Sequence, residues 1–107
     1  MMIIQTDNGE ERTLNIEGGD YWTVPSFSRL VQKTDRVIRL LASKGNRIRK
    51  LKHKSIYGRV YIEENEVFDY PFTMIGRVSE LGNTIEKFSL VDGRLIKEEL
   101  NDKKCQI

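Results

Sequence analysis

Two helix-forming segments separated by only about three residues constrain the fold of this chain more than any other feature of its sequence. Thr23 or Ser26 can cap the first segment. Its apolar residues have the i, i+3, i+4 spacing of one buried helical face: Phe27, Leu30 and Val31. The second segment begins after Thr34, another good N-cap residue, and ends at Gly45, which favours a left-handed C-cap. Two helices joined by so short a turn form a helix-turn-helix unit.

The second helix is expected to have an apolar side and a basic side. The apolar side consists of Val37, Ile38, Leu40 and Leu41. Arg36 and Arg39 lie three residues apart and therefore share a face, which we place opposite Val37 and Leu41.

Short strands are expected on both sides of this helix pair. At the start of the chain, the runs Ile3–Thr6 and Arg12–Glu17 flank Asp7-Asn8-Gly9, and Asn-Gly is a strong hairpin signal. The basic stretch after Gly45 alternates loosely up to Ser55-Ile56-Tyr57-Gly58, which indicates a second, basic hairpin.

The remaining residues predict one short helix and a β-meander. Acidic residues in a first turn indicate a third helix over residues 63–68, ended by Asp69-Tyr70-Pro71. Three strand-like runs divided by Gly-containing turns follow it: Phe72–Ser79, Thr84–Val91 and Arg94–Glu99.

Positive charge is concentrated in the middle of the chain. Residues 29–59 contain eleven Lys or Arg and one acid, so this segment carries +10, whereas the remainder carries −8 and the whole chain +2. A segment this basic favours a polyanionic partner, most commonly a phosphate backbone. The alternative is a solvated, lysine-rich face.

The composition argues against catalysis and metal binding. The chain has one cysteine, Cys105, and one histidine, His53, and it shows neither a nucleophile beside a base nor a phosphate-binding Gly-rich loop. We therefore expect no catalytic residue, no metal site and no cofactor. No apolar stretch approaches a membrane span and the acidic start does not match a signal peptide, so we expect a soluble cytoplasmic protein without a membrane partner.

Three segments between residues 21 and 68 carry a resemblance to a known family. They are Tyr21-Trp22-Thr23-Val24, the helix from Thr34 to Gly45, and Gly58–Val67. Together they resemble the winged helix-turn-helix of the MerR-like superfamily, especially its excisionase branch, although Gln32-Lys33 and Glu63 depart from the family pattern. With the flanking strands, this gives an α+β fold with three parts. They are an N-terminal β-hairpin (residues 1–19), a winged helix-turn-helix domain (20–71) and a C-terminal antiparallel β-meander (72–107).

The resemblance implies binding of double-stranded DNA, with the second helix in the major groove. Arginine offers a fork to guanine O6 and N7, so Arg36 and Arg39 are the candidates for base contact. Thr34 and the backbone at the start of this helix can hold a phosphate. The candidate DNA-binding residues are Lys33, Thr34, Arg36, Arg39, Lys44, Arg47, Arg49, Lys50, Lys52, Lys54 and Arg59.

The expected function is that of a small sequence-specific, nucleoid-associated DNA-binding protein. It would act as a transcriptional regulator or as an excisionase-like accessory factor in recombination, of phage or mobile-element type by analogy. Because one recognition helix contacts few base pairs, we also expect a homodimer or cooperative neighbours, with residues 72–99 as the contact.

Other interpretations remain open. One is a protein-interaction or assembly module, such as a packaging or nucleoprotein-complex subunit, whose acidic remainder contacts a basic partner. Binding to RNA or single strands is less favoured, because few aromatic residues lie among the basic ones. The helix arginines can also pair with nearby acids, and the alternating Lys50, Lys52 and Lys54 can form the polar face of an edge strand.

Overall fold

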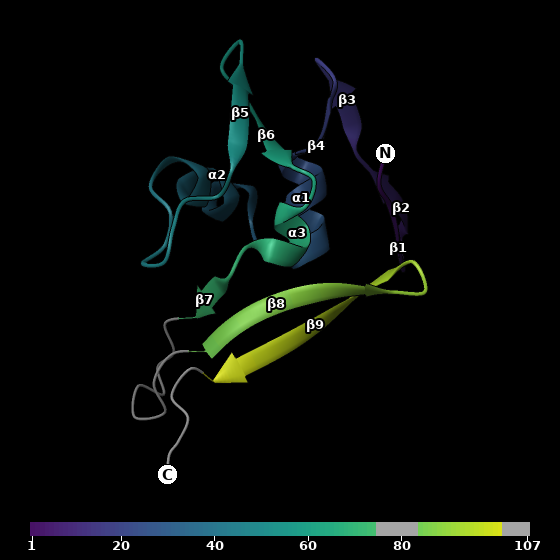
Figure 1. The fold of residues 1–107 in the computed structure, drawn as a ribbon, viewed down its shortest axis with the longest axis vertical. Helices are drawn as coiled ribbons and strands as arrows, with labels where there is room; N and C mark the ends of the chain where they lie inside the picture. Colours follow the sequence, from purple (N-terminus) through teal and green to yellow (C-terminus); the bar gives the residue numbers. More distant parts are fainter. Residues whose placement is uncertain (75–83, 102–107) are drawn as a thin grey trace.

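The structure is a computed structural model that describes residues 1–74 and 84–101 of the 107-residue chain. Within these residues the chain forms an α+β fold with two small sheets and three short helices (Figure 1). The elements in chain order are β1 (Ile3–Thr6), β2 (Gly9–Arg12), β3 (Leu14–Ile16), β4 (Gly19–Thr23), α1 (Val24–Val31), α2 (Asp35–Ser43), β5 (His53–Ile56), β6 (Arg59–Glu63), α3 (Glu66–Asp69), β7 (Phe72–Met74), β8 (Thr84–Val91) and β9 (Arg94–Asn101).

The two sheets each combine strands that are distant in the sequence. One sheet has five strands in the order β2-β1-β9-β8-β7, in which β1 and β9 are parallel and the other pairs antiparallel. The other has four antiparallel strands in the order β3-β4-β6-β5. In Figure 1 the long β8–β9 ribbon lies below α1 and α3, and the β5–β6 turn lies at the opposite end of the molecule. The N-terminal hairpin and the C-terminal strands therefore share one sheet.

The N-terminal hairpin forms, but the predicted bounds of its second strand are wrong. β1 pairs with Gly9–Arg12, and the register Thr6↔Gly9 leaves Asp7-Asn8 as a two-residue turn. The chain then crosses to the other sheet at the buried Thr13, so that Leu14–Ile16 pairs with β4 instead. The second strand of the hairpin, Gly9–Arg12, contains no apolar residue, whereas Leu14 and Ile16 follow the crossing, which is why the sequence places the strand too late.

The predicted first helix is confirmed. The side chain of Thr23 caps α1, because its Oγ1 accepts a hydrogen bond from the backbone N–H of Ser26 at 3.2 Å. Pro25 lies in the first turn, where its missing N–H leaves no acceptor unpaired. The helix ends at Gln32, which adopts a left-handed conformation with φ of 60°.

The hydrophobic core lies between the two sheets and around α1. Phe27 is fully buried, as predicted, and so is Trp22, whose Nε1 donates to the carbonyl of Glu64 at 2.9 Å. Phe72 packs edge-on against Tyr70 and Phe88, with ring centroids 4.9 and 5.9 Å apart, so aromatic side chains join α3 to β8.

The types of element predicted after residue 62 are correct, but the bounds of the third helix are not. The third helix is shorter than expected, because residue 63 belongs to β6 and α3 covers only Glu66–Asp69. The meander is confirmed as β7, β8 and β9, which pair in that order. Residues 75–79 of its first predicted run lie outside the described residues.

Candidate nucleic-acid interface

The start of α2 is fixed by two side-chain hydrogen bonds. Thr34 Oγ1 accepts from the backbone N–H of Val37 at 3.2 Å, which confirms the predicted N-cap. The carboxylate of Asp35 accepts from Ser28 Oγ at 2.5 Å and so connects α2 to α1. The angle between the two helices is therefore held by specific contacts at their junction.

The predicted apolar side of α2 is partly wrong. Ile38 and Ala42 are fully buried and Leu41 is half-buried, but Val37 and Leu40 are 37% and 50% exposed. The physical reason is that α2 packs mainly against α1 along one narrow stripe, and a short helix so placed covers only the residues on that stripe. Two apolar side chains consequently lie on the outer part of α2.

Both arginines of α2 are exposed. Arg36 lies four residues before Leu40, on the outward side of the helix. Arg39 lines a groove of about 440 Å³ whose other lining residues come from β3, from the start of α1 and from the turn and second strand of the β5–β6 hairpin. Arg59 of β6 lines the same groove, together with Thr23 and Tyr61.

The end of α2 requires a glycine. Gly45 has a φ of +80°, which confirms the predicted left-handed conformation. A Cβ at this position would lie 2.7 Å from the backbone oxygen of Arg49, so the following chain returns close to the helix end. Only a residue without a side chain fits this close approach.

Residues 46–52 form an ordered loop rather than the start of the predicted hairpin, which begins at His53. The side-chain oxygen of Asn46 accepts from the backbone N–H groups of Ile48 and Arg49 at 2.9 and 3.1 Å. Its Nδ2 donates to the carbonyl of Pro71 at 2.8 Å, and the buried Leu51 fixes the far end of the loop. The loop thus presents its exposed side chains from a defined backbone.

The hairpin of β5 and β6 confirms the second hairpin prediction at residues 53–63. The register Ile56↔Arg59 leaves a two-residue turn, and both turn residues, Tyr57 and Gly58, have positive φ values of 50° and 78°. The side chain of Tyr57 is fully exposed at the tip.

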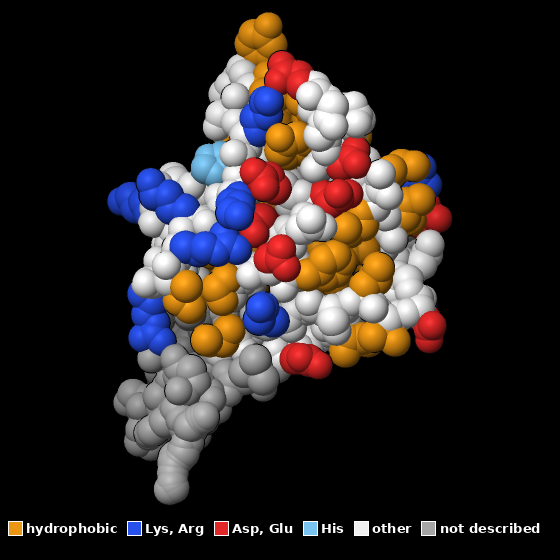
Figure 2. Space-filling view, viewed as in Figure 1, with side chains coloured by type: hydrophobic (Ala, Val, Ile, Leu, Met, Phe, Trp, Pro, Cys, Tyr) orange, Lys and Arg blue, Asp and Glu red, His pale blue; other side chains and the backbone are white. Residues whose placement is uncertain are grey.

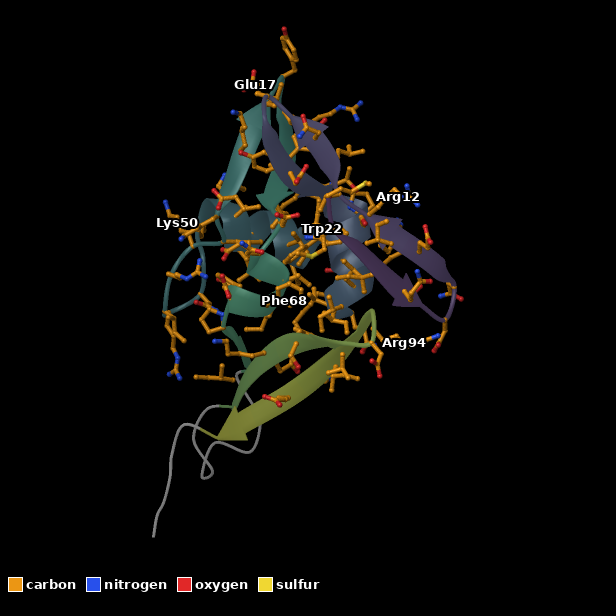
Figure 3. All side chains as sticks on the ribbon, turned by 45° about the vertical axis from the view of Figure 1, so that its right-hand side comes forward. Arg12, Glu17, Trp22, Lys50, Phe68 and Arg94 are labelled. Atoms are coloured by element: carbon orange, nitrogen blue, oxygen red, sulfur yellow. The ribbon has the colours of Figure 1, made fainter. Side chains whose placement is uncertain are left out.

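Six of the predicted DNA-binding residues form what we call the basic surface. All six side chains are exposed, and none has an acidic partner within residues 1–74 and 84–101: Arg36, Arg39, Lys44, Lys50, Lys52 and Arg59. Figure 2 shows that Lys and Arg side chains gather on the side where α2 and the loop after it lie in Figure 1, whereas Asp and Glu lie over the middle and the opposite side. In Figure 3, Lys50 and Arg12 project on opposite sides of the molecule.

Arg49 interacts with the interior of the protein. Its guanidinium donates two hydrogen bonds to the carboxylate of Glu66, at 2.7 and 2.8 Å, and Glu66 is only 2% exposed. The guanidinium also lies 4.9 Å from the centroid of the Tyr70 ring. The hydrogen bonds with Glu66 raise the pKa of Arg49 above its ordinary value. The backbone N–H of Lys52 donates to the same carboxylate at 2.7 Å, so Glu66 holds the loop at two points.

Lys33 and Lys54 are also paired. Lys33 Nζ contacts the buried carboxylate of Glu86 on β8 at 2.7 Å, which connects the turn between α1 and α2 to the five-stranded sheet. Lys54 Nζ contacts Glu17, at the tip of the β3–β4 hairpin, at 2.6 Å. Arg47 is exposed in the loop after α2, and the side chain of Thr34 caps the start of α2.

Two features of the site are not predicted from the sequence. The first is the exposure of Val37 and Leu40, which the helical period could have shown, since Leu40 is two residues from both buried positions of α2. The second is the pairing of Arg49 with Glu66 across 17 positions, for which no local signal exists.

Comparisons with family models, with curated proteins and with solved structures find no match to this chain. In the described part of the chain, none of the helices has the length and apolar character needed to span a membrane.

Proposed function

We propose that this chain is a small protein that binds double-stranded DNA through a winged helix-turn-helix. In this proposal α1 and α2 are the helix pair, and the β5–β6 hairpin is the wing. The basic surface is the observation that supports the proposal, because its six exposed cations have no acidic partner within the described residues. Cations in this state gain most from a phosphate backbone, which releases its counterions when they bind.

The placement of each cation suggests its role. Arg36 projects from the outward side of α2 and would contact a base edge in the major groove. Arg39 and Arg59 line one groove, and a phosphate there would interact with both guanidinium groups. Lys50 and Lys52, in the loop before the wing, would contact the adjoining backbone. We assign Arg49 to the stability of the fold, because Glu66 already neutralises it.

Titration of labelled duplexes tests this proposal. We expect wild-type protein to prefer duplex DNA over single-stranded DNA and RNA, with an affinity that falls steeply between two salt concentrations. Lys50→Ala should weaken binding to all duplexes alike and reduce the salt slope by about 1. Arg36→Ala should cost about 1–3 kcal/mol and relax the base preference at one position.

Arg12→Ala is the matched control for these variants. Arg12 is exposed on β2, on the side of the molecule opposite Lys50 (Figure 3), so its loss should leave duplex affinity unchanged. Equal losses in Arg12→Ala and Lys50→Ala would contradict a defined interface. No duplex binding at moderate salt would contradict the proposed function itself.

We extend this proposal to sequence-specific binding, to a role in transcription or recombination, and to nucleoid association. It also includes a homodimer through residues 72–99, which the exposed Val91 and Ile96 of β8 and β9 support. Sedimentation of the protein with and without duplex DNA measures how many copies of the chain bind to one duplex.

The alternative function is a protein-interaction or assembly module. The exposed apolar residues Val37 and Leu40 favour it, because such side chains often mark a protein contact. The titrations separate the two functions, since a module of this kind needs no affinity for any polyanion.

A further inference from the structure

The outermost residue of α2 is apolar. Leu40 is two residues from both Ile38 and Ala42, which are fully buried, and at 100° per residue it points about 200° away from each of them. Its side chain is 50% exposed, and Val37, three residues earlier on the same side, is 37% exposed. Leu40 belongs neither to the buried core nor to the half-buried apolar residues that pack against it in the described part of the chain.

Positive side chains stand at both ends of this apolar patch. Arg36 is four residues before Leu40 and Lys44 is four residues after it, so the three side chains form one line along the outer face of the helix. Neither cation has an acidic partner within the described residues. The line therefore runs from cation to apolar group to cation.

A DNA major groove offers the complementary pattern. Its rim carries phosphates and its floor carries the guanine acceptors O6 and N7, and the apolar group on the floor is the 5-methyl of thymine. An acidic protein surface would match the two cations, but it would also need an apolar group placed between its carboxylates to cover Leu40. A duplex that contains thymine carries phosphates and a methyl group as part of its regular structure. The combination of charge and apolar surface thus favours duplex DNA over an acidic protein partner.

We propose that Leu40, supported by Val37, contacts the 5-methyl group of a thymine, so that the preferred DNA site contains this thymine near the guanine contacted by Arg36. This inference rests on the proposed DNA-binding function and names the base that α2 selects. Arg36 and Leu40 are about 6 Å apart along the helix axis. For a helix lying along the groove, that distance corresponds to roughly two base-pair steps of about 3.4 Å.

Replacement of thymine by uracil in the DNA tests the inference directly. A preferred duplex is first selected from a random library, and each thymidine in it is then replaced by deoxyuridine, which keeps base pairing and removes only the methyl group. We expect the wild-type protein to bind about fourfold more weakly when the thymine at one or two particular positions is replaced. This is the effect of losing contact with one buried methyl-sized group. In Leu40→Ala, the thymine and uracil duplexes should bind equally.

Arg12→Ala serves as the control here as well, because Arg12 is exposed on β2, on the side of the molecule opposite Lys50 (Figure 3), and outside the surfaces proposed to contact DNA or a second copy. This variant should keep the wild-type difference between thymine and uracil. A wild-type protein that binds all uracil duplexes as tightly as the parent, while keeping its salt-dependent duplex affinity, would overturn the inference and leave the proposed function intact.

Three further outcomes count against the inference. Selected duplexes without a common thymine would overturn it. So would a wild-type dimer in sedimentation that Leu40→Ala converts to a monomer with unchanged duplex affinity, because α2 would then face a second copy of the chain. Absence of duplex binding altogether would overturn both proposals.

Discussion

Tyr57 combines a fully exposed side chain with a left-handed backbone conformation. It occupies the first position of a two-residue turn with φ of 50°, and its ring is fully exposed. Turns of this kind favour Asn-Gly, because Asn adopts left-handed backbone conformations more easily than an aromatic residue does. The tip of the β5–β6 hairpin is therefore a place where a substitution can increase stability.

We expect Tyr57→Asn to stabilise the protein by about 1 kcal/mol, through relief of the left-handed strain. Equilibrium denaturation under fixed conditions measures the change, and Tyr57→Phe, which keeps the strain, should match the wild type. A loss of stability in Tyr57→Asn would show that the ring makes a contact in the native state.

At the level of elements, the loop of residues 46–52 depends on one carboxylate. Glu66 is buried, accepts two hydrogen bonds from Arg49 and one from the backbone of Lys52, and so fixes the segment that displays Lys50. Loss of this carboxylate leaves a partly buried guanidinium without its counter-charge.

We expect Glu66→Ala to destabilise the protein by about 3–5 kcal/mol, the range observed when one partner of a buried ion pair is removed. The double variant Arg49→Met with Glu66→Gln should recover most of this loss, because it removes the charge and keeps an acceptor for Lys52. Chemical denaturation measures both. Equal destabilisation in the single and double variants would show that packing, and not the unpaired charge, causes the effect.

Local signals predict the helices of this fold and miss much of its sheet pairing. The capping residues Thr23 and Thr34 lie beside the helices that they begin, so the sequence contains the whole signal. The strand β4 (Gly19–Thr23) gives no comparable signal, because its Gly and Asp are depleted in strands and its register depends on β6, about forty residues away. The exposure of Leu40 likewise depends on which neighbours cover α2.

At the level of the whole molecule, a carboxylate on β2 links the five-stranded sheet to the first helix. Glu11 of β2 accepts hydrogen bonds from Arg29 at 2.8 and 3.0 Å and from Ser26 Oγ at 2.7 Å, so it connects the five-stranded sheet to α1. The hydrogen bonds from Arg29 lower the pKa of Glu11 below its ordinary value of 4.5.

A lowered pKa means that the folded protein binds this proton less tightly than the unfolded chain. The stabilisation is therefore present above about pH 4.5 and is lost as the pH falls through the lower pKa of the folded state. We expect wild type to exceed Glu11→Gln in stability near neutral pH, and the difference to shrink below about pH 4.5. Denaturation at a series of pH values measures it, and a difference that stays constant down to the acid limit would contradict this assignment.

The parallel pairing of β1 with β9 has a consequence for synthesis of the protein. Gln5 and Arg94 are partners, although 89 positions separate them, and β9 is the inner neighbour of β1 in the sheet. At roughly 5 to 20 residues per second, a ribosome needs about 4 to 18 seconds to add that stretch. Throughout this interval the edge of β1 that later pairs with β9 has no strand beside it, and its backbone groups remain open to chaperones on the nascent chain.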